Sequence, residues 1–189
     1  MKVALFGGTF DPIHNGHINA AREILKQGLV EEVWFIPVYW HAFKASNGVS
    51  PLEHRKKMIE LAIAEIKGLK VLDLNENPTY TLDTILKVKK RFPDNEYFWL
   101  MGTDLVEEFS QWQTPEKILE EIKLMLFPVP GSEQLQNDFI NESNSIRVEA
   151  EEIDLSSTIV REKMRSSKPI SKLVCPAVEQ YIEDVGLYK

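Results

Sequence analysis

The 189-residue chain is short of two things: it has a single cysteine, Cys175, and fewer cations than acidic groups. One cysteine cannot form an intramolecular disulfide, which excludes a disulfide-stabilised scaffold and indicates a reducing compartment. Cys175 directly precedes the helix-starting Pro176, so packing or capping is favoured over a nucleophilic role. The 22 Lys and Arg residues against 29 Asp and Glu residues give a net charge of −7. Nucleic-acid surfaces need clustered Lys and Arg, so no nucleic-acid partner is expected.

Long hydrophobic runs are also missing. The longest, residues 33–40, has eight residues and contains Pro37, whereas a transmembrane helix needs roughly 20. Two glycines and Asp11 follow the first apolar run too closely for a secretion signal. We therefore expect no membrane partner and a cytoplasmic location. The most polar stretch, residues 130–145, is predicted to form a surface helix and a loop.

Short apolar runs alternate with helical patterns, which is typical of an α/β domain with a mostly parallel sheet. The runs that predict strands are residues 2–6, 32–37, 69–73, 96–101, 123–128 and 146–150. Helices are predicted over about 16–27, 51–68 and 81–91, from Thr114-Pro115, and from Pro176 to Gly186. In the second of these helices, Ser50 is the predicted N-cap, with Pro51 at the first position and Glu53 closing a capping box.

No repeat or boundary divides the chain, so we predict one domain over residues 1–189. Its expected fold is Rossmann-like: a three-layer, doubly wound, mostly parallel sheet of five to six strands with helices on both faces. In such sheets ligands bind beyond the carboxyl ends of the strands, where the strand order reverses. The segments to examine are therefore those that directly follow the predicted strands.

The most informative of these segments is Gly-Gly-Thr-Phe-Asp-Pro-Ile-His-Asn-Gly-His, residues 7–17. It connects a strand to a helix start, where free N–H groups and the positive end of the helix dipole attract anions. Gly7 and Gly8 allow the backbone to approach a ligand closely. His14 and His17 are three residues apart, a spacing that places both imidazoles on one helix face. The alternative interpretation is that both histidines have a structural role only.

Two common nucleotide motifs do not match this segment. It lacks the Lys-Ser/Thr ending of a P-loop, and it is not Gly-x-Gly-x-x-Gly. Neither an NTPase nor a dehydrogenase is therefore indicated.

A second candidate site begins at Ser156-Ser-Thr-Ile-Val-Arg161. Hydroxyl residues at such a position cap helices by default. Arg161 lies one turn into the helix, so its guanidinium can converge with the hydroxyls of Ser157 and Thr158 on one anion.

Further candidates follow other strands. Lys44 lies in the segment after the second strand and is a candidate phosphate ligand. Asp104 is either a helix cap or a ligand of a nucleotide hydroxyl, and Trp112 either folds back on the core or stacks on a heteroaromatic ring. Tyr80 and Thr81 open a helix whose first-turn N–H groups could receive a carboxylate.

Together these residues resemble the signatures of the nucleotidyltransferase superfamily, namely Thr-Phe-Asp-Pro-x-His-x-Gly-His and Ser-Ser-Thr-x-x-Arg. Over nearly its whole length the chain is similar to the bacterial-type nicotinate-nucleotide adenylyltransferases. The other matching pieces are Pro51-Leu-Glu-His-Arg55, Thr79-Tyr-Thr-Leu-Asp-Thr84, Met101-Gly-Thr-Asp104 with Trp112, and Tyr181-Ile-x-x-x-Gly-Leu-Tyr188.

This resemblance implies transfer of AMP from ATP to nicotinate mononucleotide, giving deamido-NAD and pyrophosphate, a Mg²⁺-dependent step of NAD biosynthesis. The implied catalytic residues are His14, His17, Lys44 and Arg161. The implied ATP-binding residues are Gly7, Gly8, Thr9, Phe10, His14, His17, Asp104, Ser157, Thr158 and Arg161, with residues 151–189 completing the ATP site. The implied mononucleotide-binding residues are Thr9, Lys44, Tyr80, Thr81 and Trp112. No protein cage for the metal is expected, because Mg²⁺ would be held mainly by phosphates and water.

One departure from the family pattern leaves the acceptor open. Many relatives carry Pro-Pro-His-Lys after the second strand, whereas this chain has Trp40-His41-Ala42-Phe43-Lys44. The preferred acceptor could therefore be nicotinamide mononucleotide or another phosphate. A non-catalytic nucleotide-binding module is a further alternative, and a homo-oligomer is possible.

Overall fold

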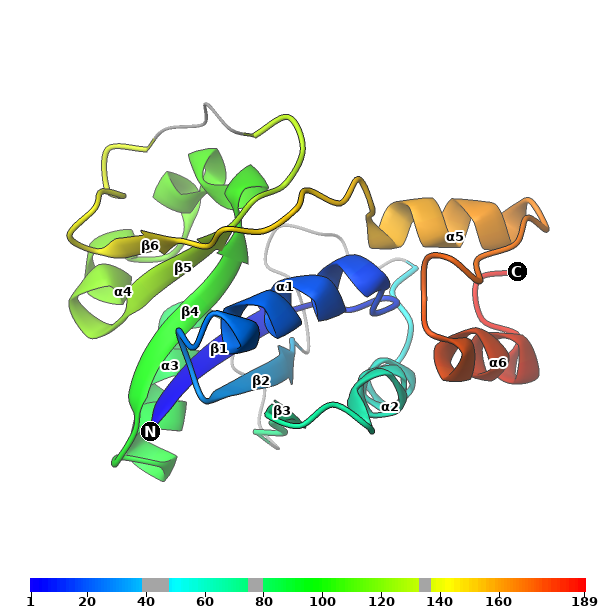
Figure 1. Ribbon diagram of the computed structural model, residues 1–189, viewed down its shortest axis with the longest axis horizontal. Coiled ribbons are helices and arrows are strands. Elements are labelled where there is room, and N and C mark those ends of the chain that lie inside the picture. The colour runs from blue at the N-terminus through cyan, green and yellow to red at the C-terminus, as the bar shows by residue number, and fades with distance from the viewer. Residues whose placement is uncertain (39–47, 75–79, 133–136) are drawn as a thin grey trace.

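A computed structural model describes residues 1–38, 48–74, 80–132 and 137–189. In these residues six strands form one sheet in the order β3-β2-β1-β4-β5-β6, and all neighbouring pairs are parallel (Figure 1). The strands are β1 (Lys2–Gly8), β2 (Glu32–Pro37), β3 (Leu69–Val71), β4 (Glu96–Gly102), β5 (Lys123–Phe127) and β6 (Ser145–Arg147). The predicted doubly wound sheet is confirmed, and the strand order reverses between β1 and β4.

Helices connect these strands and cover the sheet. They are α1 (Asn15–Lys26), α2 (Leu52–Ile63), α3 (Thr81–Arg91), α4 (Pro115–Glu121), α5 (Ser157–Arg165) and α6 (Pro176–Val185), with 3₁₀ turns η1 (Thr103–Leu105) and η2 (Glu107–Gln111). Because successive side chains of a strand point to opposite faces, each strand contributes to two cores. Ala4 and Phe6 pack with residues of α1, α2, α5 and α6, whereas Val3 and Leu5 pack with residues of α3 and α4. The predicted three layers are therefore present.

The prediction for the start of the second helix was wrong. Helix α2 begins at Leu52, Pro51 is at the cap position, and no side chain caps the helix. Ser50 lies one residue before the cap, and its backbone N–H donates to the Asp11 carboxylate (3.2 Å). The helix also ends at Ile63, earlier than predicted, and turns lead from there to β3.

The polar stretch 130–145 also differs from its prediction. Its described residues, 130–132 and 137–145, contain turns and the first residue of β6 rather than a helix. Asn side chains bond to nearby backbone in this stretch, as in the donation from the Phe139 N–H to Asn137 Oδ1 (2.9 Å). Such local bonds favour turns over helix.

No helix in the described part of the chain combines the length and the apolarity that crossing a bilayer requires.

Candidate functional site

A cavity of about 600 Å³ is lined by residues from the carboxyl ends of β1 and β4 and from the segments that follow them. This is the place where the strand order reverses and where ligands of doubly wound folds bind. All predicted site residues in the described ranges line it: Gly7, Gly8, Thr9, Phe10, His14, His17, Tyr80, Thr81, Asp104, Trp112, Ser157, Thr158 and Arg161. Lys44 and His41 lie outside the described residues. Residues far apart in the sequence are thus brought to one cavity.

The two glycines of the first motif are required by neighbouring aromatic rings. A Cβ atom added at Gly7 would lie 2.6 Å from the Trp99 ring, and one at Gly8 would lie 2.8 Å from the Phe10 ring. The sequence interpretation assigned this space to a ligand. In the structure, aromatic side chains occupy the position of the added Cβ atom, while both glycines also line the cavity, and their contact with a ligand stays a prediction.

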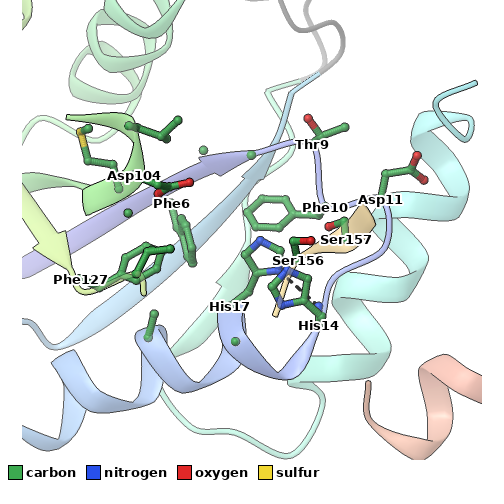
Figure 2. A pocket seen from close by; sticks show the side chains of 18 of the residues that line it. Phe6, Thr9, Phe10, Asp11, His14, His17, Asp104, Phe127, Ser156 and Ser157 are labelled. Atoms are coloured by element: carbon green, nitrogen blue, oxygen red, sulfur yellow. Dashed lines mark hydrogen bonds between the residues drawn. The ribbon is translucent and has the colours of Figure 1, made fainter. Parts of the chain in front are cut away.

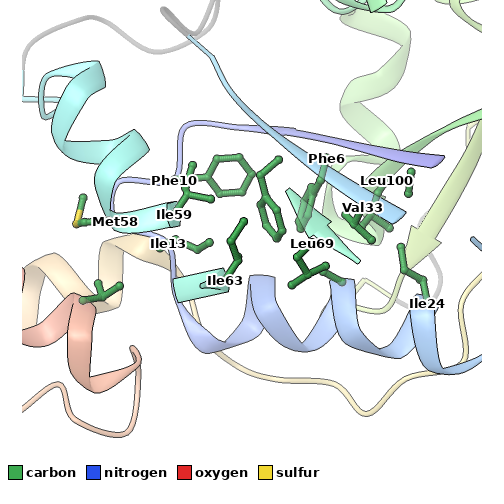
Figure 3. Packing of buried hydrophobic residues seen from close by; sticks show 14 of the residues in the cluster. Phe6, Phe10, Ile13, Ile24, Val33, Met58, Ile59, Ile63, Leu69 and Leu100 are labelled. Atoms are coloured by element: carbon green, nitrogen blue, oxygen red, sulfur yellow. The ribbon is translucent and has the colours of Figure 1, made fainter. Parts of the chain in front are cut away.

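Phe10 packs among aromatic rings next to the two histidines. Its side chain is only 2% exposed and packs with Phe6 and Phe35, whose ring centroids lie 5.4 Å away (Figure 3). The His17 ring lies 5.0 Å from it, edge to face. Phe10 has a positive φ of 49°, a left-handed conformation that costs a non-glycine residue about 1–2 kcal/mol. The aromatic packing therefore holds the chain in an unfavourable conformation directly before the histidines.

The two imidazoles are stacked at the start of α1. Their centroids are 3.6 Å apart and the ring planes differ by 28° (Figure 2). The His14 backbone N–H donates to His17 Nδ1 at 3.3 Å. A nitrogen that accepts carries no proton, so neutral His17 carries its proton on Nε2. The site therefore presents His17 Nε2–H as a hydrogen-bond donor.

Both imidazoles are held neutral. Burial lowers the pKa of His14 to about 4. Burial, and then the neighbouring His14, lowers the pKa of His17 well below its usual value. Near pH 7 the pair is therefore uncharged and is available for hydrogen bonding.

His14 also has an unsatisfied polar atom. Its Nδ1 is buried and has no hydrogen-bond partner within the described ranges. A Cβ atom on Gly16 would lie 3.0 Å from that nitrogen, so only glycine leaves the ring undisturbed there. Buried polar atoms are normally paired, and exceptions often mark functional sites.

The lowered pKa values predict a distinctive titration. The His14 and His17 resonances should stay in the neutral form from pH 8 to below pH 5.5, as followed by NMR of the imidazole carbons. In the unfolded chain these groups take up protons near pH 6.5, so the unfolded state binds more protons as the pH falls. The free energy of unfolding should therefore decline between about pH 6.5 and about pH 4. Assignment uses His14→Gln and His17→Gln, and titration of both rings between pH 6 and 7 would contradict the prediction.

Helix α5 is joined to the first motif by direct hydrogen bonds. The Ser157 hydroxyl donates to the Pro12 carbonyl (2.9 Å), and Arg161 Nη1 donates to the Asp11 carbonyl (2.7 Å). Arg161 Nη2 also donates to Thr158 Oγ1 (3.1 Å). Ser156 caps the helix by accepting from the Ile159 N–H (3.3 Å). The two predicted anion-binding segments therefore form one unit.

The charge around the cavity is uneven. Three helix N-termini border it, those of α1, α3 and α5, and each presents the positive end of a helix dipole. Arg161 and Arg165, one turn apart on α5, also line it. Carboxylates line it as well, namely Asp11, Asp104, Glu108 and Glu151. In Figure 2, Asp104 lies away from Ser156 and Ser157, so this carboxylate is separated from the start of α5.

No group of three or more His, Cys, Asp or Glu side chains suited to holding a metal occurs among the residues that the structure describes.

Asp104 and Trp112 follow the buried strand β4. Asp104 lies in η1 and is exposed. Trp112 is partly exposed and contacts the Phe109 ring at 5.2 Å while it lines the cavity. Trp112 therefore has a core side and a cavity side, and its stacking on a heteroaromatic ring stays a prediction.

Sequence reasoning missed the role of Arg55. Its side chain is 2% exposed, and its guanidinium donates to the carbonyls of Thr9 (2.7 Å), Val38 (2.9 Å) and Ser50 (2.9 Å). The available signal was its position: Arg55 precedes Met58 by three residues and Ile59 by four, so it lies on the apolar face of α2.

Comparisons with known proteins identify the family. The family model described as Cytidylyltransferase-like matches residues 5–163. The nicotinate-nucleotide adenylyltransferase of Bacillus subtilis is 33% identical over 100% of this chain and 98% of its own length. The probable nicotinate-nucleotide adenylyltransferase of Shouchella clausii is also 33% identical, over 99% and 96%. The chain belongs to the nicotinate-nucleotide adenylyltransferase family. It is therefore a nucleotidyltransferase of NAD biosynthesis, as the motifs predicted.

A solved structure supports the fold. The Plasmodium falciparum nicotinic acid mononucleotide adenylyltransferase complexed with NaAD has a TM-score of 0.82, with 99% of this chain and 97% of that chain covered. The sequence identity is 22%, so the doubly wound architecture is retained although most side chains differ.

Proposed function

We propose that this chain transfers the AMP group of ATP to the phosphate of nicotinate mononucleotide, forming deamido-NAD and releasing pyrophosphate. The observation that carries the proposal is the convergence of a neutral imidazole pair, a guanidinium and two joined helix N-termini on one cavity. We place ATP in this cavity. The ATP site belongs to a single domain, and residues 151–189 complete it.

In the proposed reaction a phosphate oxygen of the mononucleotide attacks the α-phosphorus of ATP. The bond from the α-phosphorus to the oxygen bridging to the β-phosphorus breaks, and pyrophosphate leaves. The attacking phosphate is already ionised, so no general base is required. His17 Nε2–H and the His14 ring donate to the α-phosphate oxygens, where charge is redistributed in the transition state. Alignment and charge stabilisation provide the rate enhancement.

Arg161 is the proposed ligand of the departing pyrophosphate, together with Ser157 and Thr158 at the start of α5. Its guanidinium is already fixed by Asp11 and Thr158, so little side-chain freedom is lost when phosphate binds. Lys44 is proposed from the sequence alone as a second cation for the phosphates. Mg²⁺ would be held mainly by the phosphate oxygens of ATP and by water, since it loses its hydration reluctantly.

For the ribose and adenine of ATP we propose Asp104 and the backbone of residues 7–10. For the acceptor we propose the first-turn N–H groups beside Tyr80 and Thr81 as ligands of the nicotinate carboxylate, and Trp112 as the stacking surface for the pyridine ring. A carboxylate is a better ligand for a helix N-terminus than an amide, so this placement favours the acid form of the mononucleotide.

Removing the stacking surface should affect one substrate only. Trp112→Ala is expected to raise KM for nicotinate mononucleotide about tenfold, because ring stacking contributes about 1–3 kcal/mol, while KM for ATP changes less than twofold. Initial rates at varied concentrations of each substrate give both constants. An equal rise in both would refute the stacking role.

The proposed function is tested by incubating the purified chain with ATP, Mg²⁺ and either nicotinate or nicotinamide mononucleotide, and separating the dinucleotide products by chromatography. We expect deamido-NAD to form, and in a competition of both mononucleotides at equal concentration we expect it to predominate. Predominance of NAD would assign the amide as acceptor. No dinucleotide with either acceptor would support the non-catalytic alternative.

A further inference from the structure

Tyr188, near the C-terminus, reaches the residues of the candidate site. Tyr188 is 177 positions from Asp11 in the sequence, and its hydroxyl donates to Asp11 Oδ1 at 2.6 Å. The Asp11 side chain is only 2% exposed, and its other carboxylate oxygen accepts from the Ser50 N–H. Asp11 therefore has both carboxylate oxygens occupied, one of them by the end of the chain.

The backbone of the same residue holds Arg161. Asp11 accepts from Arg161 Nη1 through its carbonyl and from Tyr188 through its carboxylate. The carboxylate and the carbonyl belong to one residue, so a displacement of Asp11 would also move the acceptor of the guanidinium. Tyr188 is thus connected to the proposed pyrophosphate ligand through one residue, without lining the cavity itself.

The conformation of Tyr188 shows that the contact is enforced. Its φ is 63°, in the left-handed region that disfavours side chains with a Cβ. Such residues persist where the surrounding structure determines them, and they concentrate at functional sites. Burial and the adjacent Asp11 charge raise the pKa of Tyr188, so its hydroxyl remains a proton donor across the physiological range.

We infer that Tyr188 is a positioning residue for ATP: its hydroxyl fixes Asp11, and Asp11 fixes the Arg161 guanidinium and the phosphate-binding turn. This inference rests on the proposed function, because it assigns Arg161 to the phosphates of ATP. The acceptor region around Tyr80 and Trp112 has no part in the connection.

The chain offers a matched control. Tyr181, on the same C-terminal segment, is also partly buried, and its hydroxyl lies 2.8 Å from His54 Nδ1 on α2. This hydrogen bond joins α6 to α2 and does not reach Asp11. Tyr181→Phe therefore removes a comparable hydroxyl from the same C-terminal segment without loosening the phosphate-binding turn.

The test compares Tyr188→Phe with Tyr181→Phe. Calorimetry with α,β-methylene-ATP should show Kd raised about five- to tenfold in Tyr188→Phe and less than twofold in Tyr181→Phe, the usual scale for one hydrogen bond. In turnover assays KM for ATP should rise and kcat should fall in Tyr188→Phe only, with KM for the mononucleotide unchanged. Thermal unfolding of both variants should show similar losses.

Equal behaviour of the two variants toward the ATP analogue would overturn the inference, as would a rise in both substrate KM values in Tyr188→Phe. If Tyr188→Phe does not fold, a chain that ends at Leu187 takes its place, and failure of that chain to fold would assign Tyr188 to the fold and overturn the inference. An inactive wild type that binds the analogue would contradict the proposed function alone, because the binding comparison stands without turnover.

Discussion

Replacing His17 by alanine is expected to lower kcat by about 10²-fold or more, the usual scale for losing a preorganised transition-state donor. His17 Nδ1 is occupied by the His14 N–H, so Nε2–H is the only donor of this ring, and the ring is held between His14 and Phe10. Among the described residues no other ring stacks on His14, so no neighbouring ring can take the place of the His17 donor. Steady-state rates at saturating ATP and mononucleotide measure the effect.

His54→Gln is the matched control for this variant. His54 is also on a helix and is hydrogen-bonded, to Tyr181, but it does not line the cavity. The kcat of His54→Gln should stay within twofold of the wild-type value. If the kcat of His17→Ala lies within threefold of the wild-type value, His17 has a structural role only.

Replacing Arg55 by methionine is expected to reduce the free energy of unfolding by about 3–5 kcal/mol, the scale for removing one partner of a buried charged group. Three carbonyl groups would lose their donor, and the buried Asp11 carboxylate would lose a nearby positive charge. Burial lowers the pKa of Arg55 and Asp11 counteracts this shift, which indicates that the two charges depend on each other. Urea unfolding measures the change.

The adjacent Lys56 provides the control. It bonds to Asp73 at 2.7 Å, with both side chains more than one-third exposed. Exposed pairs contribute about 0–1 kcal/mol, so Lys56→Met should change the free energy of unfolding by less than about 1 kcal/mol. An equally small loss in Arg55→Met would show that the carbonyl groups find other partners.

The sequence predicted the features that depend on short-range patterns. Apolar runs bounded by glycine and proline predicted the strands. The spacing of Val178, Tyr181, Ile182 and Val185 before Gly186 predicted the last helix, which ends at Val185. The candidate site could be predicted because its residues follow the carboxyl ends of strands, where a parallel sheet brings them together.

Features that depend on tertiary contacts could not be predicted. Ser50 has the residue type of an N-cap, but the Asp11 carboxylate takes its backbone N–H. Gly7 and Gly8 were assigned to ligand approach, whereas Trp99 and Phe10 occupy the space beside them. The contact of Tyr188 with Asp11 joins the two ends of the chain, and no periodicity or motif spacing reports such a pair.

The most direct test of the account follows the side-chain nitrogens of His14, His17 and Arg161 by NMR during a titration with α,β-methylene-ATP. If one triphosphate contacts all three groups, their resonances shift together and give a single Kd. Shifts of the two imidazoles without Arg161, or two different dissociation constants, would contradict the account.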